Sequence, residues 1–402
     1  MANSKLANWF ILTLMFTKKT VRDIEVRGKT VRLRTMLNVP IKDGVVGDAM
    51  RLQAGAPTIK YLLDNGAAVV LISHHSDEAQ SFAPIVPVLS KILDKKIEFA
   101  HDCLGQKTED AVKSLKPGDL LMLENLRFHP EEKNNGDAFA KKLASYGQVF
   151  VNDDFTDCHR EHASMVGIPK YLPAVAGLNV EKEVTTITDA LDKPKRPLVA
   201  VAAGAKISTK IPIVSFLIKK VDALFIGGAM ANTFLAALGK PIGKSLSETD
   251  MIDTAKKIMR EAAAAHKTLL LPIDVVVTTD LATHAGLRTV GVDEVGDQDI
   301  IADIGPKSTD QLKTIISPRG SVIWNGPVGI AEDPVFATGT AAVAKDIVDS
   351  GAFSIVGGGD TADYVDGAGL SGKFSFVSTG GGASMELMSG NKLPGVEALL
   401  DR

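Results

Sequence analysis

The sequence predicts an α/β fold with two doubly wound parallel-sheet domains, joined by a helix and a hinge. Short apolar runs alternate with segments of helical length along the chain. The runs are continuous, which is typical of strands buried on both faces of a parallel sheet. Alternation of such strands with helices predicts the doubly wound arrangement. A chain of 402 residues has room for two domains of this kind.

The expected strands lie in both halves of the chain. They cover residues 67–72, 119–123, 148–151, 197–201, 222–225, 267–271, 321–324, 353–356 and 374–377. Amphipathic helices are expected over residues 136–146 and 250–266, and a helix over residues 180–191 joins the two halves. Two prolines and three cations over residues 192–197 then break the pattern.

These signals divide the chain into three parts. Residues 1–14 are expected to form an extension, residues 15–185 an N-terminal domain and residues 186–384 a C-terminal domain. The apolar run over residues 9–16 is too short to span a bilayer, which takes about 20 residues. We therefore expect no membrane anchor, and we hypothesise that Met15 is an alternative start.

Composition and charge exclude several classes of protein. With 45% hydrophobic and 23% charged residues, the chain is typical of a soluble globular protein. Its net charge of −3 gives no indication of a surface that binds nucleic acid. The two cysteines, Cys103 and Cys158, are too few for a disulfide framework and fit a reducing cytoplasm.

Three glycine clusters, each at the end of an apolar run, carry the main functional signal. They span residues 226–230, 357–361 and 380–384, and each opens a stretch of helical composition. At the end of a strand, glycines present backbone N–H groups to a phosphate, because a backbone without Cβ atoms can approach the ligand closely. Three clusters in one half of the chain point to a nucleotide or another phosphorylated ligand.

Charged residues beside these clusters fit the same ligand. Lys206 and Lys210 follow a predicted strand and are expected to share one helix face near its N-terminus. Two ammonium groups in that position suit a polyphosphate. Asp360 is expected to hold Mg²⁺ between phosphates or to act as a helix N-cap, and the two roles are compatible.

In the first half of the chain, the residues that indicate a function are basic. Its arginines suggest an anionic substrate there and a nucleotide on the second half; they are Arg34, Arg51, Arg127 and Arg160. Cys158, His159 and His162 suggest a zinc site, but no second pair of ligands lies at zinc-site spacing, so phosphate binding by Arg160 is favoured. Residues 239–245 resemble a P-loop but are one residue short and follow a helical segment.

Taken together, the motifs of the chain resemble those of the phosphoglycerate kinase family from about Lys18 to the C-terminus. The matching segments are long, specific and in the same order. They are residues 38–40, 57–63, 123–129, 162–167, 324–329, 357–361 and 378–384. The resemblance implies two doubly wound domains with a tail of about residues 385–402 packing back on the first. It also implies a cytoplasmic monomer that bends at a hinge and acts in glycolysis.

The resemblance implies phosphoryl transfer between 1,3-bisphosphoglycerate with Mg-ADP and 3-phosphoglycerate with Mg-ATP. Residues implied to hold the phosphoglycerate are Arg34, Asn38, Arg51, His74, Arg127 and Arg160. Residues implied to hold the nucleotide are Lys206, Lys210, Asn325, Glu332, Gly358, Gly359, Asp360 and Thr361, with Glu332 on the ribose and Asp360 near Mg²⁺. Residues implied to surround the transferred phosphoryl group are Arg51, Lys206, Gly380, Gly381 and Gly382. Positioning and charge neutralisation are most of what this chemistry needs.

The chain departs from the family pattern at several of these places. Met36 stands where the family has an Asp that accepts a substrate hydrogen bond, and a thioether is a weak acceptor. Asp77, followed by Glu78, stands where an arginine is expected, which reverses a charge. Further departures are Asp154, Thr156 and Asp157 near Arg160, and Ala203 and Thr209 near Lys206. The Cβ of Ala203 is expected where the backbone should approach the nucleotide.

Three hypotheses follow from this pattern. The first is an active phosphoglycerate kinase with weakened triose binding, which the retained Arg51 and Lys206 favour. The second is a nucleotide-binding relative that has lost catalysis. The third is a kinase for a less anionic acceptor, which the added carboxylates would suit.

Overall fold

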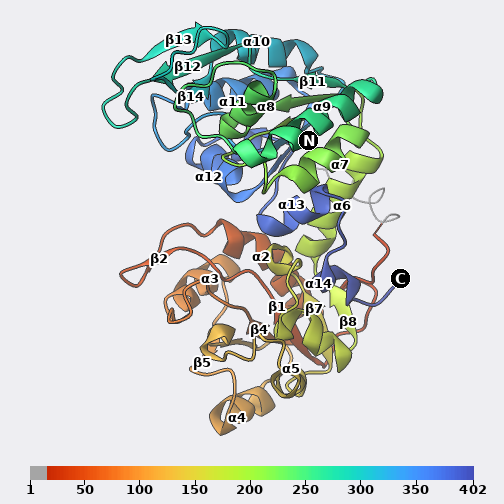
Figure 1. Cartoon of the computed structure of the whole chain (residues 1–402). Coiled ribbons are helices and arrows are strands. Elements are labelled where there is room, and N and C mark those ends of the chain that lie inside the picture. Colours follow the sequence, from red (N-terminus) through yellow and green to blue (C-terminus); the bar gives the residue numbers. More distant parts are fainter. Residues whose placement is uncertain (1–15) are drawn as a thin grey trace. The chain divides into compact units, whose positions relative to one another are not determined.

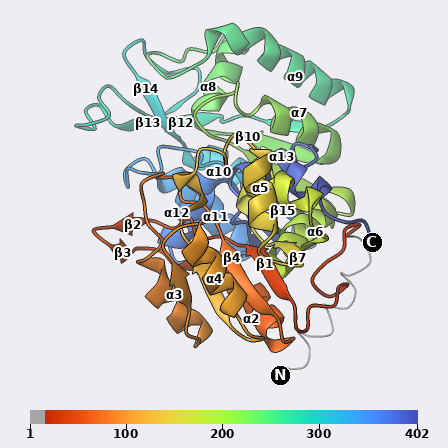
Figure 2. The same ribbon diagram turned by 90° about the horizontal axis from the view of Figure 1, so that it is seen from below.

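The computed structural model describes residues 16–402, which form two compact units. The first unit contains the described residues up to Thr185 together with Lys392–Arg402, and the second contains Thr186–Asn391. Figures 1 and 2 show the chain in two views. The expected extension and Met15 lie outside the described residues. No described helix combines the length and the apolar character that a membrane span requires.

The first unit is built on a six-stranded parallel sheet with the order β5-β6-β4-β1-β7-β8. Its strands are β1 (Thr30–Arg34), β4 (Ala68–Ile72), β5 (Glu98–Ala100), β6 (Leu120–Leu123), β7 (Val149–Asn152) and β8 (Ala174–Ala176). A short hairpin of β2 (Ile41–Lys42) and β3 (Val45–Val46) follows β1. Every residue of β4, β6 and β7 is buried, as the continuous apolar runs predicted.

Helices connect these parallel strands. They are α2 (Met50–Asp64), α3 (Ile85–Leu93), α4 (Gln106–Ser114) and α5 (Asp137–Ala144), while α14 (Pro394–Glu397) lies in the returning C-terminal tail. Short helical turns are η2 (Leu126–Phe128), η3 (Phe155–Asp157), η4 (Ala163–Gly167) and η5 (Ile168–Lys170). Helix α6 (Leu178–Asp192) carries the chain from the first unit into the second.

The second unit has its own six-stranded parallel sheet, with the order β11-β10-β9-β15-β16-β17. Its strands are β9 (Leu198–Ala202), β10 (Ala223–Ile226), β11 (Thr268–Leu270), β15 (Ser321–Asn325), β16 (Phe353–Gly357) and β17 (Phe376–Val377). Its helices are α7 (Ile211–Lys220), α8 (Gly228–Ala237), α9 (Ile252–Ala264), α10 (Pro306–Ile315), α11 (Thr338–Ser350), α12 (Gly359–Gly367) and α13 (Gly382–Met388), with turns η6 (Thr249–Met251) and η7 (Ser371–Lys373). The two parallel sheets confirm the predicted fold class.

Three features differ from the sequence prediction. A separate antiparallel sheet of β13 (Arg288–Gly291), β12 (Asp274–Thr278) and β14 (Ile300–Ile304) was not expected. The chain rejoins the first unit at Lys392 rather than near residue 385, because α13 belongs to the second unit. The region around Lys206 is a turn, not a helix; α7 begins only at Ile211, where Pro212 fits the first helical turn.

The returning tail packs on the first unit beside β8, as Figure 1 shows. The Leu400 amide donates to the carbonyl of Ala174 at 2.9 Å, and the Lys19 amide donates to the carbonyl of Leu400 at 2.7 Å. The Gly395 amide donates to the carbonyl of Cys158 at 2.8 Å. The tail therefore supports the segment that follows β7, where the candidate site of this unit lies.

Candidate functional site

In the first unit, the basic residues singled out from the sequence meet at the carboxyl ends of the parallel strands. Arg34 ends β1, and His74 follows β4. Arg127 lies in η2, shortly after β6, and Asp157 ends η3, shortly after β7. The carboxyl edge of an open parallel sheet is where ligands bind in α/β proteins.

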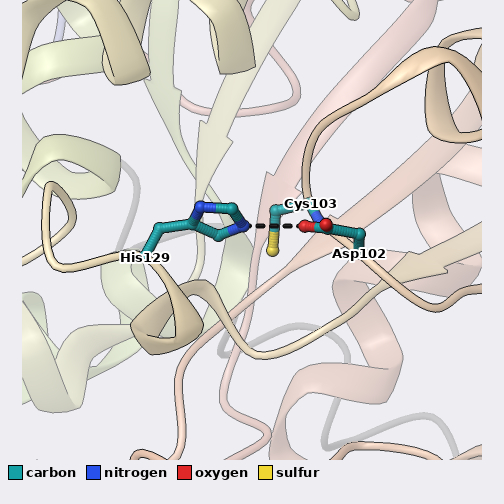
Figure 3. A group of neighbouring side chains, drawn as sticks. All are labelled: Asp102, Cys103 and His129. Atoms are coloured by element: carbon teal, nitrogen blue, oxygen red, sulfur yellow. Dashed lines mark hydrogen bonds and ion pairs between the residues drawn. The ribbon is translucent and has the colours of Figure 1, made fainter.

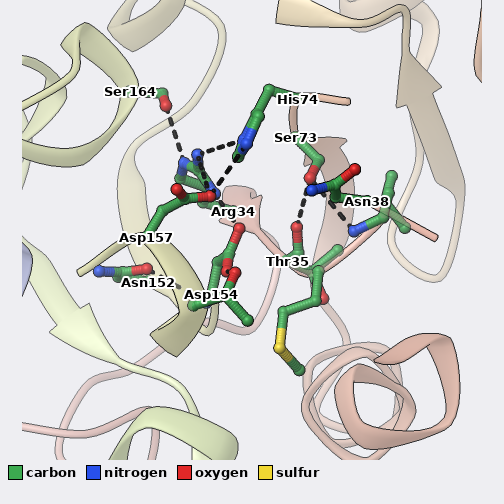
Figure 4. A network of polar contacts seen from close by, with 12 residues as sticks. Arg34, Thr35, Asn38, Ser73, His74, Asn152, Asp154, Asp157 and Ser164 are labelled. Carbon is green, nitrogen blue, oxygen red and sulfur yellow. Dashed lines mark hydrogen bonds and ion pairs between the residues drawn. The ribbon is translucent and has the colours of Figure 1, made fainter. Parts of the chain in front are cut away.

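Arg34 is fully buried, and every nitrogen of its guanidinium group has a partner (Figure 4). Its Nε donates to the Ser164 hydroxyl at 2.8 Å, and one terminal nitrogen forms an ion pair with Asp154. The other terminal nitrogen lies 3.0 Å from Nδ1 of His74 and 3.6 Å from Oδ2 of Asp157. The charge of Arg34 is thus balanced inside the protein by buried carboxylates.

Asp157 stands at the centre of the network, with its side chain 5% exposed. Its Oδ2 lies 3.1 Å from Nε2 of His74, and its Oδ1 lies 3.0 Å from Nε of Arg160. Burial alone would raise the pKa of Asp157, but the contacts with His74, Arg34 and Arg160 lower it below its ordinary value. The group is therefore a carboxylate at neutral pH.

His74 links the two charged groups as a neutral imidazole. Burial holds its pKa well below the ordinary value, despite the opposing effect of Asp157. With its proton on Nε2, the ring donates to Asp157 and accepts from Arg34 at Nδ1, which fits both distances. The imidazole is thus oriented by the network on both sides.

A cavity of about 470 Å³ brings together Asn38, Arg51 and Asp77. Arg51, at the start of α2, donates to the carbonyl of Asn38 at 2.6 Å, and the Asn38 side chain accepts from the Ser76 amide at 3.0 Å. Asp77 is exposed, and its carboxylate accepts from the Ala79 amide at 2.9 Å. A negative charge therefore lies in the same cavity as Arg51.

Arg127 and Met36 are both buried, so neither is a free side chain at the surface of the site. One terminal nitrogen of Arg127 donates to the carbonyl of His75 at 3.2 Å, while its buried Nε has no hydrogen-bond partner among the described residues. Met36 is 1% exposed, and its sulfur accepts a long contact of 3.8 Å from the amide of Asn179. Met36 is part of the core, so it leaves no acceptor at the surface of the site.

In the second unit, all three glycine clusters open helices at the carboxyl ends of strands, as predicted. Gly227 precedes α8 after β10, Gly358 precedes α12 after β16, and Gly381 precedes α13 after β17. Gly358 has a φ of 91° and a ψ of 141°, a conformation that is essentially confined to glycine. Each cluster directs the N–H groups of a helix N-terminus toward the edge of the sheet.

Lys210 lies at this edge, at the end of the turn that precedes α7. Its ammonium group is hydrogen-bonded to the side-chain oxygen of Asn325 and lies 3.5 Å from the sulfur of Met385. Burial lowers the pKa of Lys210, and the nearby charge of Asp360 opposes that shift. Lys206 is exposed in the same turn, and Thr209 donates to its carbonyl at 3.1 Å.

Two expectations about this edge need correction. The N-cap of α12 is Gly358, so Asp360 is an exposed residue of the first helical turn rather than a cap. Ala203 is fully buried in the core cluster of the sheet. A Cβ added to Gly227 would lie 3.3 Å from the Cβ of Ala203. The Cβ of Ala203 therefore packs in the core instead of meeting a ligand.

A cavity of about 280 Å³ lies beside these residues in the second unit. Gly204, Gly228, Glu332 and Asp360 contribute to its lining. Its other walls are mostly apolar and include residues of α8, β12 and β14, such as Val275 and Ile301. An apolar slot with a carboxylate and helix N-termini nearby suits a flat base joined to an anionic chain.

Comparison with known proteins identifies the family. The sequence profile described as phosphoglycerate kinase matches residues 21–391. The chain belongs to the phosphoglycerate kinase family. A protein named phosphoglycerate kinase from Pelotomaculum thermopropionicum is 45% identical over 391 residues, which is 96% of this chain and 100% of that protein. Another of that name from Aquifex aeolicus is 44% identical over 395 residues, again 96% of this chain and 100% of that protein.

Solved structures lead to the same family. The structure of phosphoglycerate kinase from Coxiella burnetii superposes with a TM-score of 0.86 at 36% identity, covering 95% of this chain and 98% of that one. The structure of the enzyme of that name from Pyrococcus horikoshii gives a TM-score of 0.83 at 30% identity, with the same coverages. Membership in the family makes the chain a phosphotransferase with a carboxyl group as acceptor.

Some residues of these sites were not singled out from the sequence. Glu132 is fully buried and accepts hydrogen bonds from both the backbone and the hydroxyl of Ser164, which in turn holds Arg34. Nothing in the local sequence around Glu132 distinguishes it from a solvated acid. The apolar walls from β12 and β14 were missed together with their sheet, although the run Val275–Val277 was a readable strand signal.

A second cluster of polar side chains lies outside the predicted sites (Figure 3). Nε2 of His129 and Oδ1 of Asp102 are 2.7 Å apart, and Cys103 lies beside them. The thiol of Cys103 is buried and donates to the carbonyl of Glu124 at 2.9 Å, and burial raises its pKa well above the ordinary value. The Cys103 thiol therefore stays protonated, and Asp102 joins the segments through bonds with the His129 ring and the Cys103 backbone amide.

Proposed function

We propose that the chain catalyses reversible phosphoryl transfer between the carboxyl group of 3-phosphoglycerate and the terminal phosphate of Mg-ATP, with 1,3-bisphosphoglycerate and Mg-ADP on the other side. One observation carries the assignment of ligands to units. The first unit gathers cationic side chains at the carboxyl edge of its sheet, whereas the second gathers three helix N-termini and an apolar cavity at its own edge.

We assign the nucleotide to the second unit. The base and ribose fit the cavity of about 280 Å³, where Glu332 is available to accept from the ribose hydroxyls. Gly358, Gly359 and Thr361 belong to the first turn of α12 or its cap, where N–H groups suit phosphate oxygens. Lys210 and Lys206 supply positive charge, and Asn325 orients Lys210.

The fit of Mg²⁺ rests on Asp360. Its carboxylate is exposed in the first turn of α12 and lines the same cavity. Its oxygens therefore remain accessible to an ion. Mg²⁺ prefers one or two carboxylates together with phosphate oxygens and water. Bound there with the nucleotide, the ion would neutralise phosphate charge.

We assign the triose to the first unit, with Arg51 and Asn38 in the cavity of about 470 Å³ and with Arg34, His74, Arg127 and Arg160 beside it. The carboxylate of the acceptor would attack the terminal phosphorus in line, while ADP leaves. Arg51, Lys206 and the amides of Gly380, Gly381 and Gly382 are proposed to hold the transferred group. Closure at the hinge belongs to the same proposal, because water must be excluded during transfer.

Weakened binding of the triose is part of this proposal. Arg34 and Arg160 are already paired with Asp154 and Asp157, and Asp77 shares the cavity of Arg51. The same pairing favours, as a second candidate, a carboxylate acceptor with fewer negative charges than 3-phosphoglycerate. Action in the cytoplasm as a monomer remains a proposal that rests on the family resemblance, and sedimentation of the purified protein tests the oligomeric state.

Product analysis tests the proposed reaction. The full-length protein is incubated with Mg-ATP, 3-phosphoglycerate and hydroxylamine, which traps acyl phosphates, and ADP is followed by phosphorus NMR. We expect ADP and a hydroxamate to form only when 3-phosphoglycerate is present. Lys206→Ala should lower the rate at least tenfold, on the order of one lost charge-assisted contact to phosphate, while Lys244→Ala, at an exposed lysine outside the site, should not. Unchanged activity in Lys206→Ala would contradict its assigned role.

A further inference from the structure

A buried carboxylate lies in the middle of the basic site of the first unit, where an anionic ligand would be expected to bind. We propose that Asp157 is a specificity-determining residue: its carboxylate takes the place of a ligand's anionic group among Arg34, His74 and Arg160, and an incoming anion must compete with it. This inference rests on the proposed function, because it assumes that the same donors serve the acceptor.

The donors around Asp157 are arranged as they would be around a bound anion. Nε of Arg160 lies 3.0 Å from one carboxylate oxygen, and Nε2 of His74 lies 3.1 Å from the other. A terminal nitrogen of Arg34 lies 3.6 Å from that second oxygen. Both oxygens are therefore engaged, and the three donors lie at the carboxyl ends of three different strands: Arg34 ends β1, His74 follows β4 and Arg160 follows β7.

Every nitrogen of the Arg34 guanidinium group is engaged by a buried partner in this state. Its two terminal nitrogens contact Asp154, His74 and Asp157, and its Nε donates to Ser164 (Figure 4). Since all of these partners are buried, a ligand would have to break the network to reach the guanidinium group. Arg34 thus serves to orient Asp157 as long as both carboxylates are present.

Arg160 is the accessible part of the network. Its side chain is 41% exposed, whereas those of Arg34 and His74 are nearly inaccessible. A ligand approaching from solvent meets Arg160 first and finds its Nε already bonded to Asp157. Competition for one charge-assisted hydrogen bond corresponds to about tenfold to a hundredfold in affinity.

The competition also determines which ligands are penalised most. The carboxylate of Asp157 repels every anion in the site, and the repulsion grows with the charge of the ligand. A phosphorylated hydroxy acid such as 3-phosphoglycerate therefore loses more affinity than glycerate, which carries one carboxylate and no phosphate. The wild-type protein is expected to discriminate weakly between the two.

Calorimetric titration of the full-length protein with 3-phosphoglycerate and with glycerate, without nucleotide, tests this inference. Asp157→Asn keeps the shape of the side chain and removes its charge, and we expect it to bind 3-phosphoglycerate at least about tenfold more tightly. The gain for glycerate should be smaller. Asp157→Thr also removes the charge and leaves a short polar side chain. It should again gain more affinity for 3-phosphoglycerate than for glycerate, and it replaces Asp157→Asn in the test if that variant does not fold.

A control variant removes one negative charge from the surface. Glu161→Gln loses an exposed charge next to Arg160. It should change the affinity for 3-phosphoglycerate less than threefold, on the scale of a screened surface charge. Equal gains in all variants, or no gain in either Asp157 variant, would overturn the inference.

Binding and turnover separate this inference from the proposed function. If Asp157→Asn gains affinity but no variant transfers phosphate to 3-phosphoglycerate, the proposed reaction fails and the role of Asp157 stands. If the wild-type protein transfers phosphate but the Asp157 variants bind the triose no more tightly, the role of Asp157 fails and the reaction stands.

Discussion

Asp153, next to the network, shows how one buried residue ties stability to pH. Its side chain is fully buried, its Oδ1 accepts from the Asn179 amide at 2.8 Å, and its Oδ2 has no hydrogen-bond partner among the described residues. Burial raises the pKa of Asp153 to about 8, against the effect of these contacts. The folded protein therefore keeps a proton that the unfolded chain has released at neutral pH.

The sign of the resulting pH dependence follows from linkage. Between the unfolded pKa of 3.8 and the folded pKa of about 8, the native state binds the extra proton, so stability falls as the pH rises. The loss amounts to at most about 1.4 kcal/mol per pH unit. We expect Asp153→Asn to flatten this fall between pH 5 and pH 8, as measured by urea unfolding. Parallel curves for wild type and variant would contradict the assignment.

Sequence reading located the residues of the first site but not their pairing. The extra acids at 154 and 157 were visible as departures near Arg160, and Arg34 was expected to bind the substrate. The contact between Arg34 and Asp157 depends on strands β1 and β7 lying side by side. Glu132 joins the network because it accepts from Ser164, which contacts Arg34. Such contacts are long-range in sequence, so no local pattern predicts them.

At the scale of elements, helix N-termini determine the geometry of the nucleotide half. A Cβ on Gly358 would lie 2.8 Å from Nδ2 of the Asn325 side chain, and residues other than glycine rarely adopt the backbone conformation found there. The next residue, Gly359, is the first residue of α12, and a Cβ added there would have no other atom within 4 Å. The two glycines form a matched pair for substitution.

We expect Gly358→Ala to destabilise the second unit by about 1–3 kcal/mol, the cost of a strained backbone position. It should also weaken binding of Mg-ADP at least about tenfold, because displacement of Asn325 disturbs Lys210. Gly359→Ala should leave the stability close to that of the wild type, because no described atom lies within 4 Å of the added Cβ. Thermal unfolding and calorimetry of both variants measure these effects, and similar behaviour of the two would refute the argument.

Element prediction succeeded where local rules decide the structure and failed where packing does. The strands of continuous apolar residues and the helices opened by glycines were predicted, since both depend on neighbours in sequence. Strand β1 was missed because Arg32 and Arg34 interrupt its apolar pattern, although both are fully buried. The expected helix at Lys206 failed because Pro212 lets the helix start only at Ile211.

At the scale of the whole molecule, the chain leaves the first unit in α6 and returns for its last residues. Leu393, Val396 and Leu399 of the tail are buried, and Lys18 donates to the carbonyl of Leu399 at 3.2 Å. The stability of the first unit therefore depends on residues that are synthesised after the second unit.

Truncation after Asn391 is expected to destabilise the first unit by more than about 3 kcal/mol, because several apolar side chains lose their burial. Binding of Mg-ADP should persist, since the residues around the cavity of the second unit remain. Removal of only Asp401 and Arg402 breaks their ion pairs with Lys18 and Asp23 and should cost about 1–2 kcal/mol, less than the full truncation. Calorimetric scans with and without Mg-ADP distinguish the two units; loss of nucleotide binding on truncation would contradict this division of the chain.

Taken together, the two sites predict a working phosphotransferase whose triose site is weakened by its own carboxylates. Initial rates at saturating Mg-ATP, with 3-phosphoglycerate varied over a wide range, test this prediction. We predict saturable turnover, with a KM for the nucleotide below about 1 mM and a KM for 3-phosphoglycerate above that common upper value. Absence of turnover that depends on 3-phosphoglycerate, in protein that binds Mg-ADP, would contradict the activity. A triose KM as low as that of the nucleotide would contradict the weakened site.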